Sequence, residues 1–130
     1  MSNYVVFNRS VLDLIKEVGA VASGSESHLA SMESFYRVAM KTNARLPFNK
    51  FLECVMIPYG DRLRQHDDDF FLEAVDVSSG GATVGDIVSV LRGAWRGMDA
   101  GGRARVLAGI DRVLEAGDRI LLASAARGQS

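Results

Sequence analysis

The sequence has little cysteine, proline and lysine, and no long apolar run. Cys54 is the only cysteine, which excludes an internal disulfide and a zinc site built from several cysteines. No uninterrupted apolar run is longer than four residues, far below the ~20 needed to span a bilayer. No N-terminal run combines a basic region, an apolar segment and a cleavage site. We therefore expect an intracellular protein that makes no membrane contact, in a compartment where a thiol stays reduced.

The composition that is present suits one globular domain over residues 1–130. Hydrophobic residues make up 48% and charged residues 24%, and only two residues are proline. The formal net charge of −1 favours neither polyanions nor polycations as partners. Residues 1–66 carry eight cations and six anions (+2), whereas residues 67–130 carry seven and ten (−3). Twelve of the fifteen cations are arginine, a bias that we attribute to base composition.

The first half of the chain shows apolar residues at helical spacing, three and four residues apart. Ser10 and Asp13 form a capping-box pattern that predicts the start of a first helix. A second helix is expected from about Ser27 to Lys41. Pro47 suits the first turn of a third helix, and Pro58 should end or kink it, with Ile57 pushed out of the α region.

The second half continues the pattern. One residue of Asp67-Asp68-Asp69 can cap a short helix, where its negative charge suits the helix dipole. Thr83 and Asp86 form a second capping-box pattern, and Asp99 is expected to cap a long last helix.

Together these segments predict an all-α fold, a single compact bundle of five to six helices. Residues 3–7 are the one place where a strand is plausible, and a lone strand would have nothing to pair with. The predicted core consists of Leu12, Ile15, Phe35, Phe51, Leu52, Val55, Phe71, Ile87, Leu91, Trp95, Ile110 and Leu114.

Residue types that often form sites lack the spacing that chemistry requires. His28 and His66 are too far apart for a metal motif, and the aspartates at 67–69 lack the glycine and glutamate of a calcium loop. Gly80–Gly85 lacks both the lysine of a nucleotide-binding loop and a preceding strand. Cys54 has no fixed cation next to it in sequence that would favour a thiolate. We therefore expect no catalytic residue, no metal and no cofactor.

The candidate interaction residues are Trp95, Arg92, Arg96, Arg105, Arg112 and Arg119. Tryptophan and arginine are enriched at interface hot spots, although a lone tryptophan is usually core. The last three arginines recur every seven residues and share a helix face. Acidic residues within four positions, as in Asp99–Arg103 and Glu115–Arg119, should partly neutralise that face. Small residues at 100, 101, 104, 108 and 109 would let another helix approach closely, either within the chain or from a second subunit.

The order of several short motifs resembles the small all-helical proteins encoded by large DNA viruses of eukaryotes, many of which lack an assigned function. These motifs span about residues 8–122: Val11-Leu12-Asp13-Leu14-Ile15-Lys16-Glu17, Leu46-Pro47-Phe48, Ile57-Pro58-Tyr59, Asp69-Phe70-Phe71, and the run from Asp86 to Asp99. The terminal helix departs from that pattern, because it is rich in Ala, Gly and Arg rather than Lys. The resemblance implies a viral protein that acts in the host cytoplasm or is packaged in the virion, and it brings no catalytic residues.

The sequence therefore predicts a non-catalytic protein-interaction or structural module, with a protein partner or a homo-oligomer. The alternative is a nucleic-acid-associated regulatory protein that uses the arginine face of the last helix. The net acidic second half counts against phosphate binding.

Overall fold

The structure is a computed structural model, and it describes residues 2–21, 26–72 and 83–128. Across these ranges the chain is helical and contains no strand, which confirms the all-α class. The helices are α1 (Asn3–Val21), α2 (Glu26–Thr42), α3 (Leu46–Phe51), α4 (Ile57–Arg64), α5 (Asp68–Leu72), α6 (Thr83–Ala94) and α7 (Ala100–Gly128). A π-helical turn, Leu52–Met56, joins α3 to α4 into one rod, and a 3₁₀ turn, Trp95–Gly97, follows α6. With that rod counted once, the described residues form six helical units.

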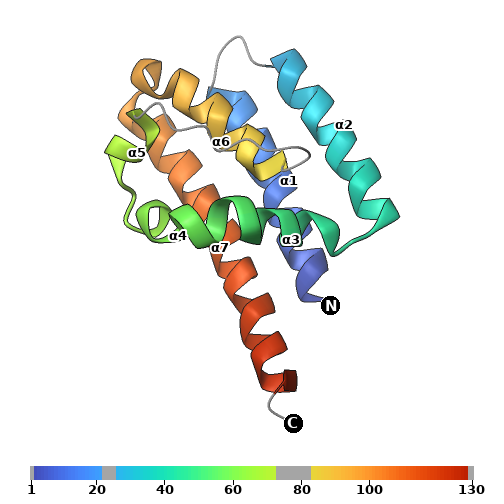
Figure 1. The fold of residues 1–130 in the computed structure, drawn as a ribbon. Coiled ribbons are helices and arrows are strands. Elements are labelled where there is room, and N and C mark those ends of the chain that lie inside the picture. Colours follow the sequence, from blue (N-terminus) through green and yellow to red (C-terminus); the bar gives the residue numbers. More distant parts are fainter. Residues whose placement is uncertain (1, 22–25, 73–82, 129–130) are drawn as a thin grey trace.

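An antiparallel pair of helices, α1 and α7, runs through the centre of the molecule (Figure 1). Two glycines of α7 lie where the helices come closest. A Cβ atom on Gly109 would lie 3.0 Å from Leu14 Cδ1, and one on Gly102 would lie 3.4 Å from Val21 Cβ. The neighbour that these small residues admit is therefore α1 of the same chain.

The first helix begins earlier than the sequence suggested. Residues 3–7, where a strand was plausible, belong to it, and the expected cap at Ser10 is wrong. Phe7 and Val11 are fully buried and continue the helical face that Leu14 and Val18 form further along. The Tyr4 N–H donates to Ser2 Oγ at 3.1 Å, so Ser2 takes the capping position. Ser10 lies inside the helix, where its hydroxyl donates to the carbonyl oxygen of Val6.

A buried polar contact joins α2 to α1. The Tyr36 hydroxyl donates to Asn8 Oδ1 at 2.8 Å, and Asn8 Nδ2 donates to the carbonyl oxygen of Ala44 at 3.1 Å. Both side chains are 1% exposed, and burial raises the pKa of the Tyr36 phenol far above its ordinary value of 10.0. The contact fixes the register of α2 and ties its far end to α1.

Phe35 is not a core residue, contrary to the sequence-based prediction. Its side chain is 59% exposed, whereas Leu29, Met32 and Tyr36 form the buried side of α2. Successive residues of a helix point in directions about 100° apart. Because Tyr36 points into the core, the neighbouring Phe35 points to the side of α2 and lies in solvent. Of the other predicted core residues, Leu52 is half-buried and the rest are buried.

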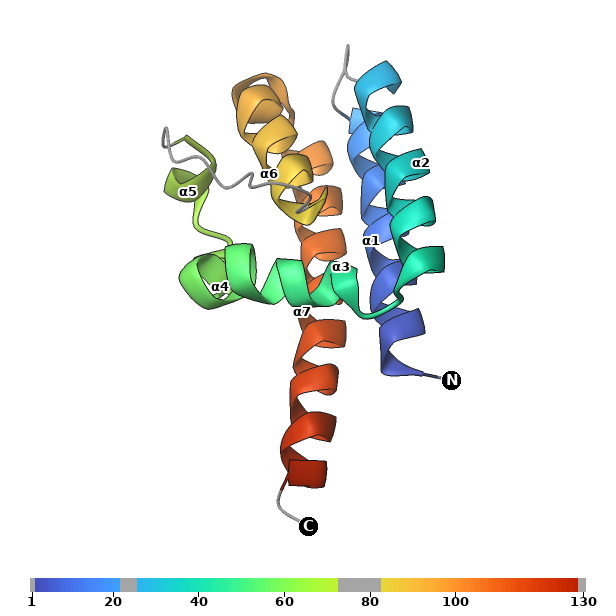
Figure 2. The same ribbon diagram turned by 45° about the vertical axis from the view of Figure 1, so that its right-hand side comes forward.

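The rod formed by α3 and α4 lies across α7 (Figure 2). Pro47 lies in the first turn of α3, as expected. Pro58 does not end the rod, and Ile57 keeps α-helical angles (φ −64°, ψ −53°), contrary to expectation. The π-helical turn just before Pro58 widens the backbone there, which accommodates a ring that would otherwise meet the carbonyl group one turn earlier.

The last helix is longer than every other helix in the described ranges. Its 29 residues correspond to about 43 Å at ~1.5 Å per residue, and its C-terminal end stands clear of the other helices (Figures 1 and 2). Asp99 caps its start as predicted, because Asp99 Oδ1 accepts the Gly102 N–H at 2.7 Å.

We predict that Tyr36→Phe lowers the free energy of unfolding by about 1–3 kcal/mol, because it leaves buried Asn8 Oδ1 without a donor. Asn8→Ala should also destabilise, and the double variant should lose less than the two single losses added together. Urea denaturation measures all three variants. Tyr59→Phe is the control, since no hydrogen bond of its hydroxyl is present in the described residues. An equal loss for Tyr36→Phe and Tyr59→Phe would contradict the prediction.

A pair of glycine substitutions tests the close approach of α1 and α7. Gly93→Ala places a Cβ where nothing lies within 4 Å, so helix propensity should raise stability by up to ~1 kcal/mol. Gly109→Ala pushes against Leu14, which is 1% exposed, so overpacking should cancel that gain or reverse it. Thermal melting compares the two variants, and similar increases would show that the contact is not tight.

Candidate functional site

Trp95 lies in the core rather than on a surface. It is 1% exposed and stacks on Phe71, with ring centroids 4.1 Å apart and planes 16° apart. The guanidinium of Arg103 lies 5.1 Å from the Trp95 ring, and its Nε and Nη2 donate to the Trp95 carbonyl oxygen at 3.1 and 2.7 Å. Instead of the ion pair expected with Asp99, Arg103 therefore forms two hydrogen bonds to the backbone of the 3₁₀ turn that precedes α7.

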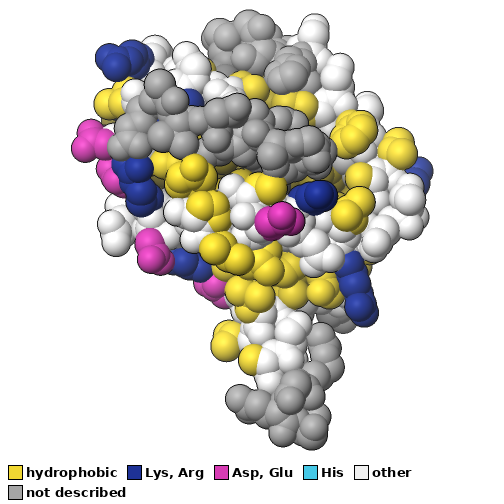
Figure 3. Space-filling view, viewed as in Figure 1, with side chains coloured by type: hydrophobic (Ala, Val, Ile, Leu, Met, Phe, Trp, Pro, Cys, Tyr) yellow, Lys and Arg dark blue, Asp and Glu magenta, His cyan; other side chains and the backbone are white. Residues whose placement is uncertain are grey.

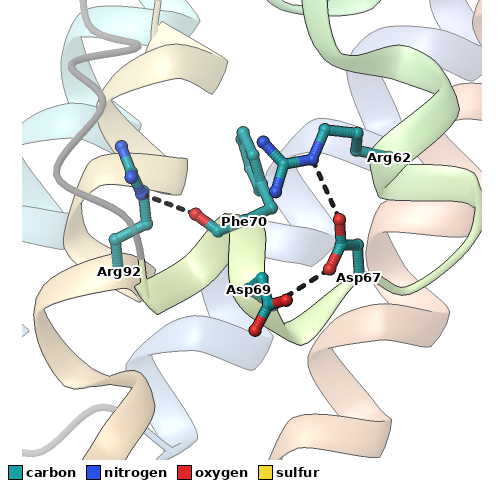
Figure 4. Close-up of polar contacts among 5 residues, drawn as sticks. All are labelled: Arg62, Asp67, Asp69, Phe70 and Arg92. Atoms are coloured by element: carbon teal, nitrogen blue, oxygen red, sulfur yellow. Dashed lines mark hydrogen bonds and ion pairs between the residues drawn. The ribbon is translucent and has the colours of Figure 1, made fainter.

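Arg92 also has a structural place, next to Phe70 (Figure 4). Its Nε donates to the Phe70 carbonyl oxygen at 3.0 Å, and its guanidinium lies 5.3 Å from the Phe70 ring. The Arg62 guanidinium lies 5.4 Å from the same ring. Phe70 itself is fully buried, so two cations flank an aromatic side chain that belongs to the core.

The acidic cluster at residues 67–69 is a helix cap, as the sequence predicted. Asp67 Oδ1 accepts the Asp69 N–H at 3.0 Å, and Asp67 Oδ2 accepts from Arg62 Nε at 2.9 Å (Figure 4). The hydrogen bond from Arg62 holds the pKa of the Asp67 carboxyl below its ordinary value of 3.8. Within residues 2–21, 26–72 and 83–128, no group of three His, Cys, Asp or Glu residues could hold a metal ion.

Two donors near these rings have no acceptor among the residues that the structure describes. They are Arg92 Nη2 and Trp95 Nε1, and both atoms are buried.

The arginine face of α7 is largely engaged by carboxylates. Arg105 Nη2 lies 2.9 Å from Glu17 Oε2 of α1, and Arg119 Nη2 lies 2.8 Å from Glu115 Oε1, a pair that the sequence predicted. Arg112 and Arg96 are exposed. The six candidate residues do not converge: the structure distributes them among the core, two ion pairs and separate surface positions.

His66 is the second histidine singled out from the sequence, and it pairs with a carboxylate. Its backbone is left-handed (φ 53°) at the end of α4, and its Nε2 lies 2.8 Å from Asp111 Oδ2 of α7. About two helical turns further along α7, Asp118 Oδ1 lies 2.8 Å from Arg64 Nη2. These two pairs fasten the end of α4 to α7. The His28 side chain lies outside the described residues, as do Gly80–Ala82 and the side chains of the Thr83 and Asp86 pattern.

A hollow of about 660 Å³ lies near the start of α7, between Val21, Met98, Gly101 and Arg105 among others. Its walls are largely backbone and small side chains. The helix N-terminus at its edge is already capped by the Asp99 carboxylate, and Arg105 is held by Glu17. These partners occupy the groups that an anionic ligand would use.

A second hollow is a groove of about 390 Å³ along α1 and α2, and the sequence analysis did not identify it. Its apolar lining is Val5, Leu12 and Met40, and its charged lining is Arg9, Asp13, Lys16 and Arg37. The signal was present as seven-residue spacing of Val5 with Leu12 and of Arg9 with Lys16. It was missed because the first helix was expected to begin only at Ser10.

Large apolar side chains are also exposed on the surface. Those exposed by 38% or more are Val5, Phe35, Val38, Leu46, Ile57, Leu72, Leu121 and Leu122. Figure 3 shows hydrophobic side chains gathered over the α3–α4 rod and others on the part of α7 that stands clear of the body. Leu122, on that part of α7, is 70% exposed and Ile57 of α4 is 74% exposed.

Comparison with protein-family models, with curated proteins and with solved structures found no match to this chain. None of the helices in the described ranges is long and apolar enough to cross a membrane.

The lowered pKa of Asp67 predicts an acid-sensitive contribution to stability. A carboxyl whose pKa is lower in the folded state than in the unfolded state stabilises the fold in full at pH values above its ordinary pKa, which is 3.8 for this residue. That contribution is lost as the pH falls through the folded pKa. Asp67→Asn should therefore reduce stability at pH 7 and show a shallower fall between pH 5 and pH 2 in thermal melting.

Asp13→Asn is the matched control, because Asp13 is exposed and forms no ion pair among the described residues. If both variants follow the same pH profile, the Arg62–Asp67 contact does not contribute in the way the geometry indicates.

Proposed function

We propose that this chain is a non-catalytic protein-interaction module whose protein partner covers the free end of α7. The observation that carries the proposal is the stretch from Ile120 to Ala126, which contains no charged residue and includes Leu122 at 70% exposure. This stretch lies where α7 leaves the body (Figure 2). Large apolar side chains that are exposed together on one helix are often covered by other protein, because they gain free energy when they leave water.

The apolar end of α7 does not stand alone. The α4 helix contacts α7. Just before α4, Met56 packs against Gly117 of α7: its Sδ would lie 3.4 Å from a Cβ atom added to that glycine. The next residue along the rod is Ile57, which is 74% exposed. A partner on the end of α7 that also reached the start of α4 would bury apolar surface from two helices.

The charged groups support the same function. Arg105, Arg119 and Arg64 are each held by a carboxylate of the chain itself. The nucleic-acid alternative therefore has less support. To bind phosphate groups, Arg105 and Arg119 of α7 would first have to break their ion pairs with Glu17 and Glu115. A viral protein that acts in the host cell or in the virion is part of the proposal, and its support is the order of sequence motifs.

Substitution at the end of α7 tests the proposal. We expect the full chain either to form an oligomer in size-exclusion chromatography with light scattering or to retain a partner in a pull-down from its native cell. Leu122→Glu should abolish that association and leave the melting temperature nearly unchanged, because residue 122 is exposed.

Ser124→Glu is the matched control, since it introduces the same charge on the same segment about 200° around the helix. It should weaken association less than Leu122→Glu. A monomer that retains no partner, or association that is unaffected by Leu122→Glu, would refute the proposed function.

A further inference from the structure

The groove between α1 and α2 has the character of a docking site for one more helix. Figure 2 shows the two helices side by side along the edge of the molecule. The groove has an apolar floor of Leu12 and Met40, extended by Val5, which is 42% exposed. Arg9 and Lys16 form one rim, and Arg37 lies on the other side, from α2.

The residues of α1 in this groove repeat every seven positions. Val5 and Leu12 form an apolar row, and Arg9 and Lys16 form a charged row displaced by four residues. This is the relation between the a and e positions of a coiled coil, where the apolar row packs and the charged row selects the partner. The two rows therefore have the spacing that allows a third helix to pack against α1 and α2.

The charge of the rim determines what kind of helix fits. Arg9 and Lys16 form no ion pair within the described residues, and Arg37 has a single, long contact with Glu33 at 3.3 Å. Asp13 is the one acidic residue in the lining. Charge complementarity favours an acidic partner, because a basic helix would face Arg9 and Lys16 with like charge.

We propose that this groove binds an acidic amphipathic helix of a partner protein. The partner helix carries two acidic residues seven positions apart, opposite Arg9 and Lys16, and an apolar row that enters between Leu12 and Met40. Two pairs of acidic residues within one helix of this chain have this spacing. Asp111 and Asp118 are engaged by His66 and Arg64, and in the pair Glu26 and Glu33 of α2 the second residue is paired with Arg37. The helix therefore comes from another protein rather than from a second copy of this one.

This inference does not depend on the end of α7. Leu122 is not among the residues that line the groove, so each surface can be altered while the other is kept. Failure of one experiment leaves the other conclusion standing.

The test uses the full chain and a phage-displayed library of helical peptides with randomised surface positions. Enriched peptides should carry Asp or Glu at seven-residue spacing beside an apolar row. Fluorescence anisotropy with the enriched peptides should show at least ~10-fold weaker binding to the double variant Arg9→Glu/Lys16→Glu. The matched control is Arg96→Glu/Arg112→Glu, which changes the net charge equally at exposed positions outside the groove, and it should bind within about 2-fold of the wild type.

A charge exchange makes the test specific for pairing. Peptides in which the two acidic residues are replaced by lysine should lose binding to the wild type and regain it with Arg9→Glu/Lys16→Glu. The proposal is overturned if no peptide is enriched, or if enriched peptides lack the acidic pair. It is also overturned if binding is unchanged by the reversal, or if the reversal dissociates a wild-type dimer. Groove-dependent binding to phosphatidylserine vesicles, with no peptide binding, would assign the groove to a membrane surface instead.

Discussion

The close contact between α1 and α7 is the constraint on which the other elements depend. Glycine at positions 102 and 109 lets the backbones approach, and Leu14 and Val21 fill the space that side chains would otherwise occupy. A glycine inside a helix costs about 1 kcal/mol relative to alanine, so α7 gives up intrinsic helix stability at these sites in exchange for packing. With this pair fixed, α2 packs on α1, and the α3–α4 rod crosses α7.

Polar contacts then set the positions of the outer helices. Asn8 and Tyr36 align α2 along α1, while His66 and Arg64 hold the end of α4 against α7. Because the first contact is buried and the side chains of the other two pairs are 40–46% exposed, the contacts differ in how much they stabilise the fold. The buried hydrogen bonds resist separation of α2, whereas exposed ion pairs contribute little beyond orientation. The surfaces left over are the apolar end of α7 and the groove of α1 and α2.

Much of the fold could be predicted from the sequence, because apolar periodicity and capping residues report local structure directly. The starts of α2, α5 and α7 follow from them, and so do ten of the twelve predicted core residues. The start of α1 could not be predicted so easily, since Asn8, Arg9 and Ser10 look like a break. Asn8 fits inside a buried helix face only because Tyr36 and Ala44, about 30 residues away, satisfy its side chain. The α1–α2 groove was not predicted, because Val5 and Arg9 lie before the expected start of the first helix. The exposure of Phe35 could not be predicted either, because it depends on which side of α2 packs on the other helices.

The position of Trp95 gives the molecule a built-in optical reporter. It is the only indole in the chain, and it lies at the corner where α5, α6 and the start of α7 meet. Since the ring is stacked on Phe71 and buried away from water, we expect its emission at the short wavelength of an apolar environment, and a shift to the red when this corner opens. Fluorescence therefore follows this corner and circular dichroism follows the helices together, so the two signals distinguish local loosening from global unfolding.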